Sequence, residues 1–223
     1  MNNTLNSVSA DTIQPKKKTT YYHLVIDRSG SMDSCWLETK QVIEKQLLDL
    51  QRIQAETPNS QLIFSYCGFN QVIQFGERLM PIGQSKMDWE RIYPDGMTSL
   101  NDAIGESIHY LNQKIGAALS DADTDVIMLI MTDGHENSSK QYTATAVKTL
   151  METCEQTGKW NFLFLGAGLD VTEVTAAYDR GDKNAYSFAK ASLSMSFNKV
   201  NSELEDYVKQ KEQNIKKTKF FKD

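Results

Sequence analysis

The chain has 223 residues, of which 40% are hydrophobic and 24% are charged, so it is large and apolar enough to bury a continuous core. Its 24 Lys and Arg residues are outnumbered by 29 Asp and Glu residues, and the net charge of -5 argues against nucleic acid as the main partner. We expect one α/β domain at residues 21–208, between a flexible polar leader at residues 1–20 and a basic polar tail at residues 209–223.

Targeting signals and cysteine usage suggest the compartment. The leader contains no apolar run that could form a signal peptide or a membrane span, so neither export nor membrane association is expected. The three cysteines, Cys35, Cys67 and Cys154, are odd in number and show no C-x-x-C spacing, which indicates neither a disulfide framework nor a zinc site. Both observations favour a cytoplasmic protein.

The first half of the chain predicts a β-α unit followed by a hairpin. Residues 23–27 form a short apolar run that ends in Asp27, as is typical of a buried parallel strand. Two further runs, at residues 62–67 and 72–75, flank a turn and predict an antiparallel pair. Between these strands, a helix is indicated by apolar residues that share one helical face: Trp36, Ile43, Leu47 and Leu50.

A long connection at residues 76–97 follows. It is rich in Pro and Gly and has weak periodicity, and we expect a short helix within it at residues 87–92. Connections of this length often have a function. Its large side chains, Trp89, Tyr93 and Met97, are expected to pack the connection onto the sheet, and the alternative is an apolar rim that faces a partner.

The second half alternates helices and strands. A helix should start after Thr98 or Ser99, either of which could cap it, and the strand at residues 126–131 is apolar on both faces and leads into Asp133. The remaining elements are expected as helix, strand, helix, strand and helix, at residues 141–156, 160–165, 171–178, 185–188 and from 191.

The alternation predicts a doubly wound, Rossmann-like α/β fold with a mostly parallel central sheet of about six strands. One strand should be antiparallel at an edge, and helices should cover both faces. Ligands bind such sheets beyond the carboxyl ends of the strands. Asp27 and Asp133 are both expected at that edge.

The turn after the first strand places oxygen donors at alternate positions, in Asp27, Ser29 and Ser31. Gly30 between the serines can adopt conformations that other residues resist. Hard cations such as Mg²⁺ prefer oxygen ligands and often keep several waters and few carboxylates. The alternative is simple helix capping, which the same residue types perform.

These three residues, together with Thr98 in a later loop and Asp133 at a strand end, closely resemble the metal ion-dependent adhesion site of the von Willebrand factor A (vWA) family. The resemblance covers about residues 21–207. It implies a site for Mg²⁺, with Mn²⁺ or Ca²⁺ as alternatives. Ser29 and Ser31 would ligate the metal directly, Thr98 directly or through water, and the two aspartates through water or by their own approach.

The absence of an export signal and of flanking modules indicates an intracellular, stand-alone type of vWA domain. A metal with only two carboxylates beside it stays electropositive and favours an added carboxylate. We therefore expect a protein-binding module, not an enzyme, whose partner exposes an Asp or Glu; a AAA-type ATPase or another assembly would suit. Two alternatives stay open: a Mg-dependent hydrolase or phosphoryl-transfer enzyme, for which no convincing base is found, and a structural subunit whose metal bridges a homo-oligomer.

Overall fold

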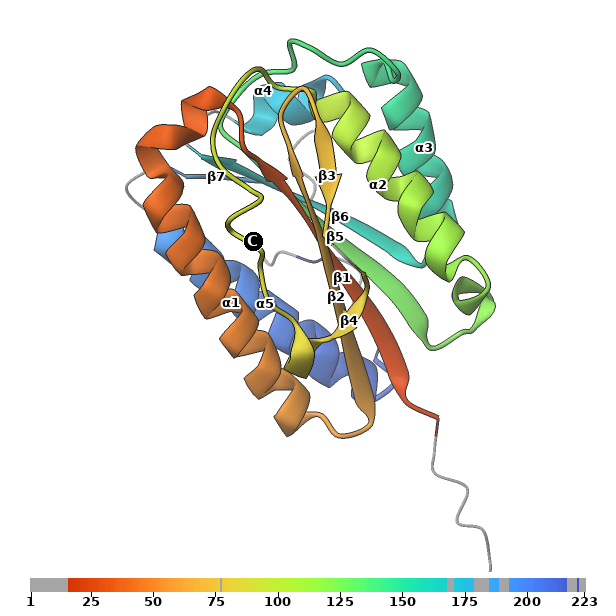
Figure 1. The fold of residues 1–223 in the computed structure, drawn as a ribbon. Helices are drawn as coiled ribbons and strands as arrows, with labels where there is room; N and C mark the ends of the chain where they lie inside the picture. The colour runs from red at the N-terminus through yellow and green to blue at the C-terminus, as the bar shows by residue number, and fades with distance from the viewer. Residues whose placement is uncertain are drawn as a thin grey trace, which may run out of the picture.

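A seven-stranded sheet lies at the centre of the described part of the chain, in the order β3-β2-β1-β5-β6-β7, with β4 also paired to β2 (Figure 1). The computed structural model describes residues 16–76, 78–167, 171–178, 185–188, 193–215 and 220. The strands are β1 (Lys18–Asp27), β2 (Ser60–Phe69), β3 (Ile73–Phe75), β4 (Met80–Pro81), β5 (Thr124–Thr132), β6 (Trp160–Ala167) and β7 (Ala185–Phe188).

Strand directions confirm the predicted doubly wound sheet. β1 pairs in parallel with β2 and β5, and β6 pairs in parallel with β5 and β7. The antiparallel edge consists of two short strands, β3 and β4, which both pair with β2. β5 is buried along its whole length, as its uniformly apolar sequence predicts for a strand covered on both faces.

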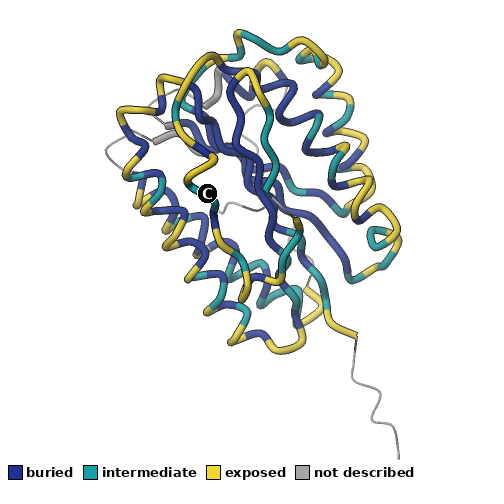
Figure 2. The backbone as a smooth tube through the Cα atoms, in the orientation of Figure 1, coloured by how far each residue is buried: buried dark blue, intermediate teal, exposed yellow. Residues whose placement is uncertain are grey.

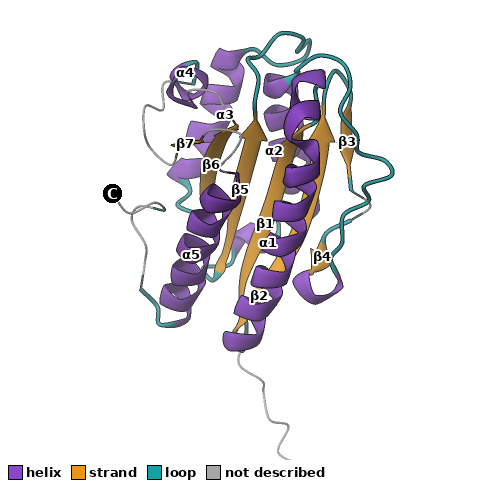
Figure 3. Ribbon diagram, turned by 90° about the vertical axis from the view of Figure 1, so that its left-hand side faces the viewer, coloured by secondary structure: helices purple, strands orange, loops and turns teal. Residues whose placement is uncertain are grey.

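Helices cover both faces of this sheet (Figures 1 and 3). Helices α1 (Trp36–Glu56) and α5 (Leu193–Glu212) pack together on one face, whereas α2 (Leu100–Ile115) and α3 (Ala144–Gln156) pack on the other. Helix α4 (Val171–Ala176) contacts β6 and β7. The central strands β1, β2, β5 and β6 are therefore mostly buried, and the outer helix surfaces are exposed (Figure 2). Helix α5 continues four residues into the segment expected to be a tail.

The predicted α1 face is confirmed in detail. Ile43, Leu47 and Leu50 are spaced four and three residues apart, so they lie on one side of the helix, and all three are buried against the sheet. Burial of each such side chain contributes about 1.5–3 kcal/mol to the free energy of unfolding. This face fixes α1 on the sheet immediately after the turn that carries Ser29 and Ser31.

The prediction of a short helix at residues 87–92 is wrong. The only helical turn between β4 and α2 within the described residues is a 3-10 turn, η2 (Ile82–Gln84). Contacts with β2 explain the difference: the backbone N–H of Asp88 donates to the Tyr66 hydroxyl at 3.1 Å, and Ile92 packs tightly over Gly68. These contacts hold the segment in an irregular path that local propensity does not favour.

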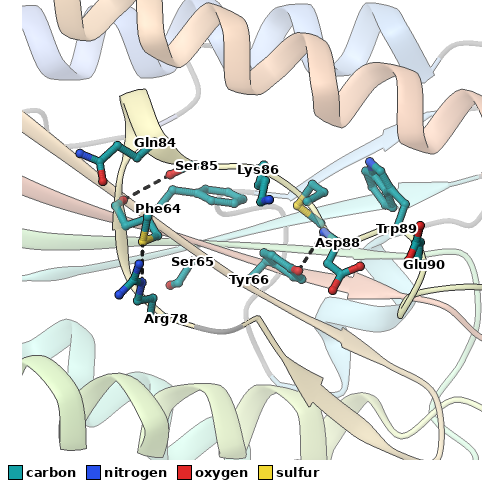
Figure 4. Close-up of a pocket in the computed structure, with 12 residues that line it drawn as sticks. Phe64, Ser65, Tyr66, Arg78, Gln84, Ser85, Lys86, Asp88, Trp89 and Glu90 are labelled. Atoms are coloured by element: carbon teal, nitrogen blue, oxygen red, sulfur yellow. Dashed lines mark hydrogen bonds between the residues drawn. The ribbon is translucent and has the colours of Figure 1, made fainter.

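A cavity of about 690 Å³ lies between β2 and this connection (Figure 4). Phe64 and Tyr66 of β2 line it on one side, and Lys86 and Trp89 of the connection line it on the other. The connection thus stands partly off the sheet edge before it returns to the carboxyl ends of the strands.

Two expectations from composition concern cysteines and membrane spans. Cys35, Cys67 and Cys154 are all buried, and none of them forms a disulfide. No helix in the described ranges combines the length and apolarity needed to cross a membrane.

Candidate metal site

Two neighbouring strands bring the carboxylates to one place. β1 and β5 are parallel and pair Ile26 with Met131, so Asp27 at the end of β1 and Asp133 just after β5 emerge at the same edge of the sheet. Asp27 is completely buried, whereas Asp133 is partly exposed. The site therefore has a buried carboxylate at its floor and a second one nearer to solvent.

The buried Asp27 carboxylate is held by two short hydrogen bonds. Its Oδ1 accepts from the backbone N–H of Ser29 at 2.7 Å, and its Oδ2 accepts from the Thr132 hydroxyl at 2.6 Å. Burial raises the pKa of Asp27 to about 6, with a smaller contribution from the charge of Asp133, although the hydrogen bonds from Thr132 and Ser29 oppose the rise. A cation at this position would favour the charged form.

The serine hydroxyls face each other and Asp133. Ser29 Oγ lies 3.1 Å from Ser31 Oγ, and the Ser31 hydroxyl donates to Asp133 Oδ1 at 2.6 Å. Ser29 precedes the 3-10 turn η1 (Gly30–Cys35), yet its side chain makes no capping bond. The Ser29 side chain therefore does not cap this turn, whereas Asp27 accepts from the backbone N–H of Ser29.

Oxygens from three parts of the chain surround the space beside Gly134. A Cβ atom built on Gly134 would lie 3.2 Å from Thr98 Oγ1, 3.6 Å from Ser31 Oγ and 4.0 Å from Asp27 Oδ2. Any larger residue would place its side chain among these oxygens. The structure thus brings together all the residues of the predicted site: Asp27, Ser29, Ser31, Thr98 and Asp133.

The donor set determines which cation would fit. Within the described ranges, no group of three or more His, Cys, Asp or Glu side chains is placed to hold a metal. The candidate site instead offers two carboxylates and three hydroxyls, all hard oxygen donors. Such a set suits Mg²⁺, which keeps several waters and needs few carboxylates, and it does not suit the nitrogen and sulfur preference of zinc.

Thr98 is fixed through its backbone. Its N–H donates to Asn137 Oδ1 at 2.8 Å, and its carbonyl accepts from the N–H groups of Asn137 and Ser138 at 3.0 and 3.1 Å. Asn137 and Ser138 belong to the loop between β5 and α3, residues 133–143, which we call the β5–α3 loop. Any displacement of Thr98 must therefore involve this loop, which also carries Asp133.

Two carboxylates extend this attachment to the start of α2. Asp102 accepts from the backbone N–H groups of residues 140, 141 and 142 at 2.7–2.9 Å. Glu136 accepts from the N–H of Asn101 at 2.8 Å and from two N–H groups of its own loop. The expected cap by Thr98 or Ser99 is therefore wrong, since Ser99 makes no side-chain capping bond and Glu136 takes this role across 35 residues of sequence.

On the other side of the site, the end of the long connection is hydrogen-bonded to the turn after β1 that carries Ser29 and Ser31, which we call the serine turn. The N–H of Gly30 donates to the carbonyl of Gly96 at 3.0 Å, and the N–H of Asp95 donates to the carbonyl of Arg28 at 2.9 Å. Gly96 has a φ of +74°, and a Cβ atom there would lie 1.9 Å from Gln71 Oε1. Only glycine suits this position, so the approach of the two loops depends on it.

The expectation that the connection's large side chains pack inward is confirmed for one of them. Trp89 packs edge-on against Trp36, with ring centroids 5.9 Å apart. Tyr93 and Met97 are instead 57% and 55% exposed, so the packing expectation is wrong for both. His135, next to Gly134, is also exposed.

Comparison with known proteins identifies the fold. No protein-family model matches the chain. The chain is 27% identical over 168 residues to human inter-alpha-trypsin inhibitor heavy chain H2, which covers 72% of this chain but only 16% of that protein. The chain therefore corresponds to a small part of that relative's length.

Solved structures are similar over most of the chain. The vWF domain of the type V pili tip protein Mfa5 from Porphyromonas gingivalis superposes with a TM-score of 0.64 and 8% identity, covering 86% of this chain and 97% of that one. The pilus adhesin SpaC from Lactobacillus rhamnosus GG gives 0.62 and 13%, covering 91% and 31%, and the von Willebrand factor type A protein from Catenulispora acidiphila gives 0.52 and 15%, covering 84% and 42%. The chain therefore has the vWA domain fold.

The Asp27 carboxylate makes the stability of the metal-free protein depend on pH. Folding raises its pKa from 3.8 to about 6, so the folded state holds a proton there that the unfolded chain releases. This contribution is complete below about pH 4 and is lost as the pH rises through about 6, at a cost of about 2–3 kcal/mol. In EDTA, Asp27→Asn should therefore gain about that much stability relative to wild type between pH 4 and pH 7. Urea unfolding of both proteins measures the difference, and a gap that does not change with pH would contradict the assignment.

The attachment of the β5–α3 loop to α2 should contribute substantially to stability. Asp102→Ala leaves three backbone N–H groups without their acceptor, and we expect the free energy of unfolding to fall by about 2–3 kcal/mol. Asp102→Asn retains one acceptor oxygen and should lose less. Urea titration at neutral pH tests the order, and equal stability of the alanine variant and wild type would show that these bonds are not important.

Proposed function

We propose that this protein is a binding module that holds Mg²⁺ at Asp27, Ser29, Ser31, Thr98 and Asp133 and uses it to capture an acidic side chain of a partner protein. The observation that carries the proposal is the convergence of hydroxyl and carboxylate oxygens on the space beside Gly134. These residues come from three separate loops at one edge of the sheet, where ligands of such folds bind.

The residues fit a metal in charge as well as in position. Asp27 is a buried carboxylate whose ionisation is disfavoured, and a divalent cation would reverse that preference. Ser29, Ser31 and Thr98 supply neutral oxygens, so the protein leaves much of the cation's charge uncompensated. When bound, the metal would supply a positive centre with affinity for an added carboxylate.

The outer side of the site is accessible to a partner. Ser31 is exposed and Asp133 is partly exposed, whereas Asp27 lies beneath them. Two of the structurally similar proteins are named as a pilus adhesin and a pili tip protein, which supports a binding role for this fold. Binding needs only the five residues, whereas catalysis would also need a base poised on a substrate.

The partner class that we propose is a protein with an exposed Asp or Glu, such as a AAA-type ATPase or another assembly, rather than nucleic acid or a membrane. The excess of acidic residues in the chain disfavours nucleic acid. The three buried cysteines, none of them in a disulfide, suit a reducing compartment, and we propose that the protein is cytoplasmic.

Binding of Mg²⁺ should stabilise the folded state, because the folded state alone assembles the five ligands. At a Mg²⁺ concentration of about 100 times Kd, the gain is about 2.7 kcal/mol, and the melting temperature should rise and return when EDTA is added. Asp27→Ala and Asp133→Ala should abolish the rise.

Asp95→Ala is the matched control for this experiment, since Asp95 is an exposed aspartate at the same sheet edge and is not one of the five residues. It should keep the full response to Mg²⁺. Thermal unfolding of the four proteins with and without millimolar Mg²⁺ decides the matter: a wild-type melting temperature that ignores both Mg²⁺ and EDTA would count against the proposal.

A further inference from the structure

We propose that three exposed side chains beside the candidate metal site, Val72, Tyr93 and Met97, form an apolar rim that receives a large apolar side chain adjacent to the partner's acidic residue. This inference rests on the proposed function, since the metal would fix the acidic residue and the rim would select what lies next to it. The occupant is thus a segment of another protein with Asp or Glu within two positions of an aromatic or large aliphatic residue.

The rim is unusual in its exposure. Val72, Tyr93 and Met97 are 58%, 57% and 55% exposed, and they are three of the seven large hydrophobic side chains exposed in the described part of the chain. Isolated exposed hydrophobic residues are ordinary, but a group of them in one place marks an interaction surface. Whether these three form a group depends on the contacts beneath them.

Those contacts place the rim beside the candidate ligands. The Arg28 guanidinium donates to the carbonyls of Tyr93 and Val72 at 3.5 and 3.4 Å, so the backbones of these two residues lie on the same arginine side chain. Arg28 directly precedes Ser29 in the chain. Met97 directly precedes Thr98, and its N–H donates to the side chain of Gln71 at 2.8 Å. The rim therefore borders the site from two segments, the turn between β2 and β3 and the end of the long connection before α2.

The backbone that carries the rim is held in place. Asn70 Nδ2 donates to the Asp95 carbonyl at 2.7 Å, and the N–H of Ser99 donates to the Asn70 carbonyl at 3.2 Å. The bonds of Gly30 with Gly96 and of Asp95 with Arg28 join the same segments to the serine turn. A partner would meet a surface whose backbone is already ordered, which lowers the entropic cost of binding.

Charge favours an acidic segment at the rim. Arg28 is buried, with 6% of its surface exposed, and forms no ion pair within 4 Å with any described carboxylate. An arginine guanidinium stays protonated in proteins. The hydrogen bonds from Arg28 to the carbonyls of Val72 and Tyr93 are long, so they compensate its charge only weakly. Asp95 attracts this guanidinium without a direct ion pair, and the positive charge beneath the rim adds to that of the metal to favour an acidic partner.

A displayed peptide library tests the pairing. Each peptide carries a fixed central Asp with three randomised positions on each side, and a second library carries Asn in its place. Selection on the full chain in Mg²⁺, followed by elution with EDTA, should enrich the Asp library for peptides with a large apolar residue within two positions of the Asp. Tyr93→Ser and Met97→Ser should each weaken the best synthetic peptide about tenfold.

Controls separate the rim from the metal site. Leu48→Ser removes an exposed leucine, 65% accessible, from the middle of α1 and should leave peptide affinity unchanged. All three variants should keep the wild-type thermal response to Mg²⁺, because none of them alters a metal ligand.

Each other outcome has a distinct meaning. Asp peptides that elute with EDTA but show no apolar preference would overturn the rim and leave the proposed function standing. Equal recovery from the Asp and Asn libraries would overturn the proposed function, and the rim with it. Mg²⁺-dependent dimerisation in light scattering that Tyr93→Ser abolishes would assign the rim to a second copy of the chain and contradict the partner proposed.

Discussion

The placement of two carboxylates on neighbouring parallel strands is the constraint on which the rest of the site depends. Asp27 and Asp133 leave β1 and β5 at the same edge, and the first is buried beneath the second. Burial of a charged group is costly unless hydrogen bonds or an opposite charge compensate it. Thr132 and the Ser29 backbone offer two hydrogen bonds to Asp27, and a cation held by the surrounding hydroxyls would provide the opposite charge.

The second organising feature is the connection of the β5–α3 loop to the start of α2. Asp102 of α2 accepts from backbone N–H groups of the loop, and Glu136 of the loop accepts from the N–H of Asn101 in α2. Asn137 binds both the N–H and the carbonyl of Thr98. Thr98 and Asp133 therefore belong to one hydrogen-bonded unit, while Ser29 and Ser31 belong to the turn after β1. The bonds from Ser31 to Asp133 and from Gly30 to Gly96 join the two units, so any movement between them in response to a ligand would have to break or lengthen these bonds.

The sequence predicted the fold because the signals of the fold are local, whereas the five candidate ligands were expected from the resemblance of their motifs to the metal site of the vWA family. Apolar strands that end in Asp and a helical face such as that of Ile43, Leu47 and Leu50 need no knowledge of distant contacts. The features it missed are long-range. Glu136 caps a helix 35 residues away, and contacts with Tyr66 and Gly68 determine the path of residues 87–92. Gly134, directly after Asp133, is the sequence signal for the crowded space between these oxygens, since a larger residue there would fill it.

Anomalous diffraction from crystals grown with Mn²⁺ would locate a bound cation, since Mn²⁺ is also an oxygen-preferring cation and scatters anomalously more strongly than any atom of the protein. We expect one strong peak in the space beside Gly134, within coordinating distance of Ser29 Oγ and Ser31 Oγ, with a water or a carboxylate on its outer side. A peak elsewhere on the molecule, or none beside Gly134 at millimolar Mn²⁺, would contradict it.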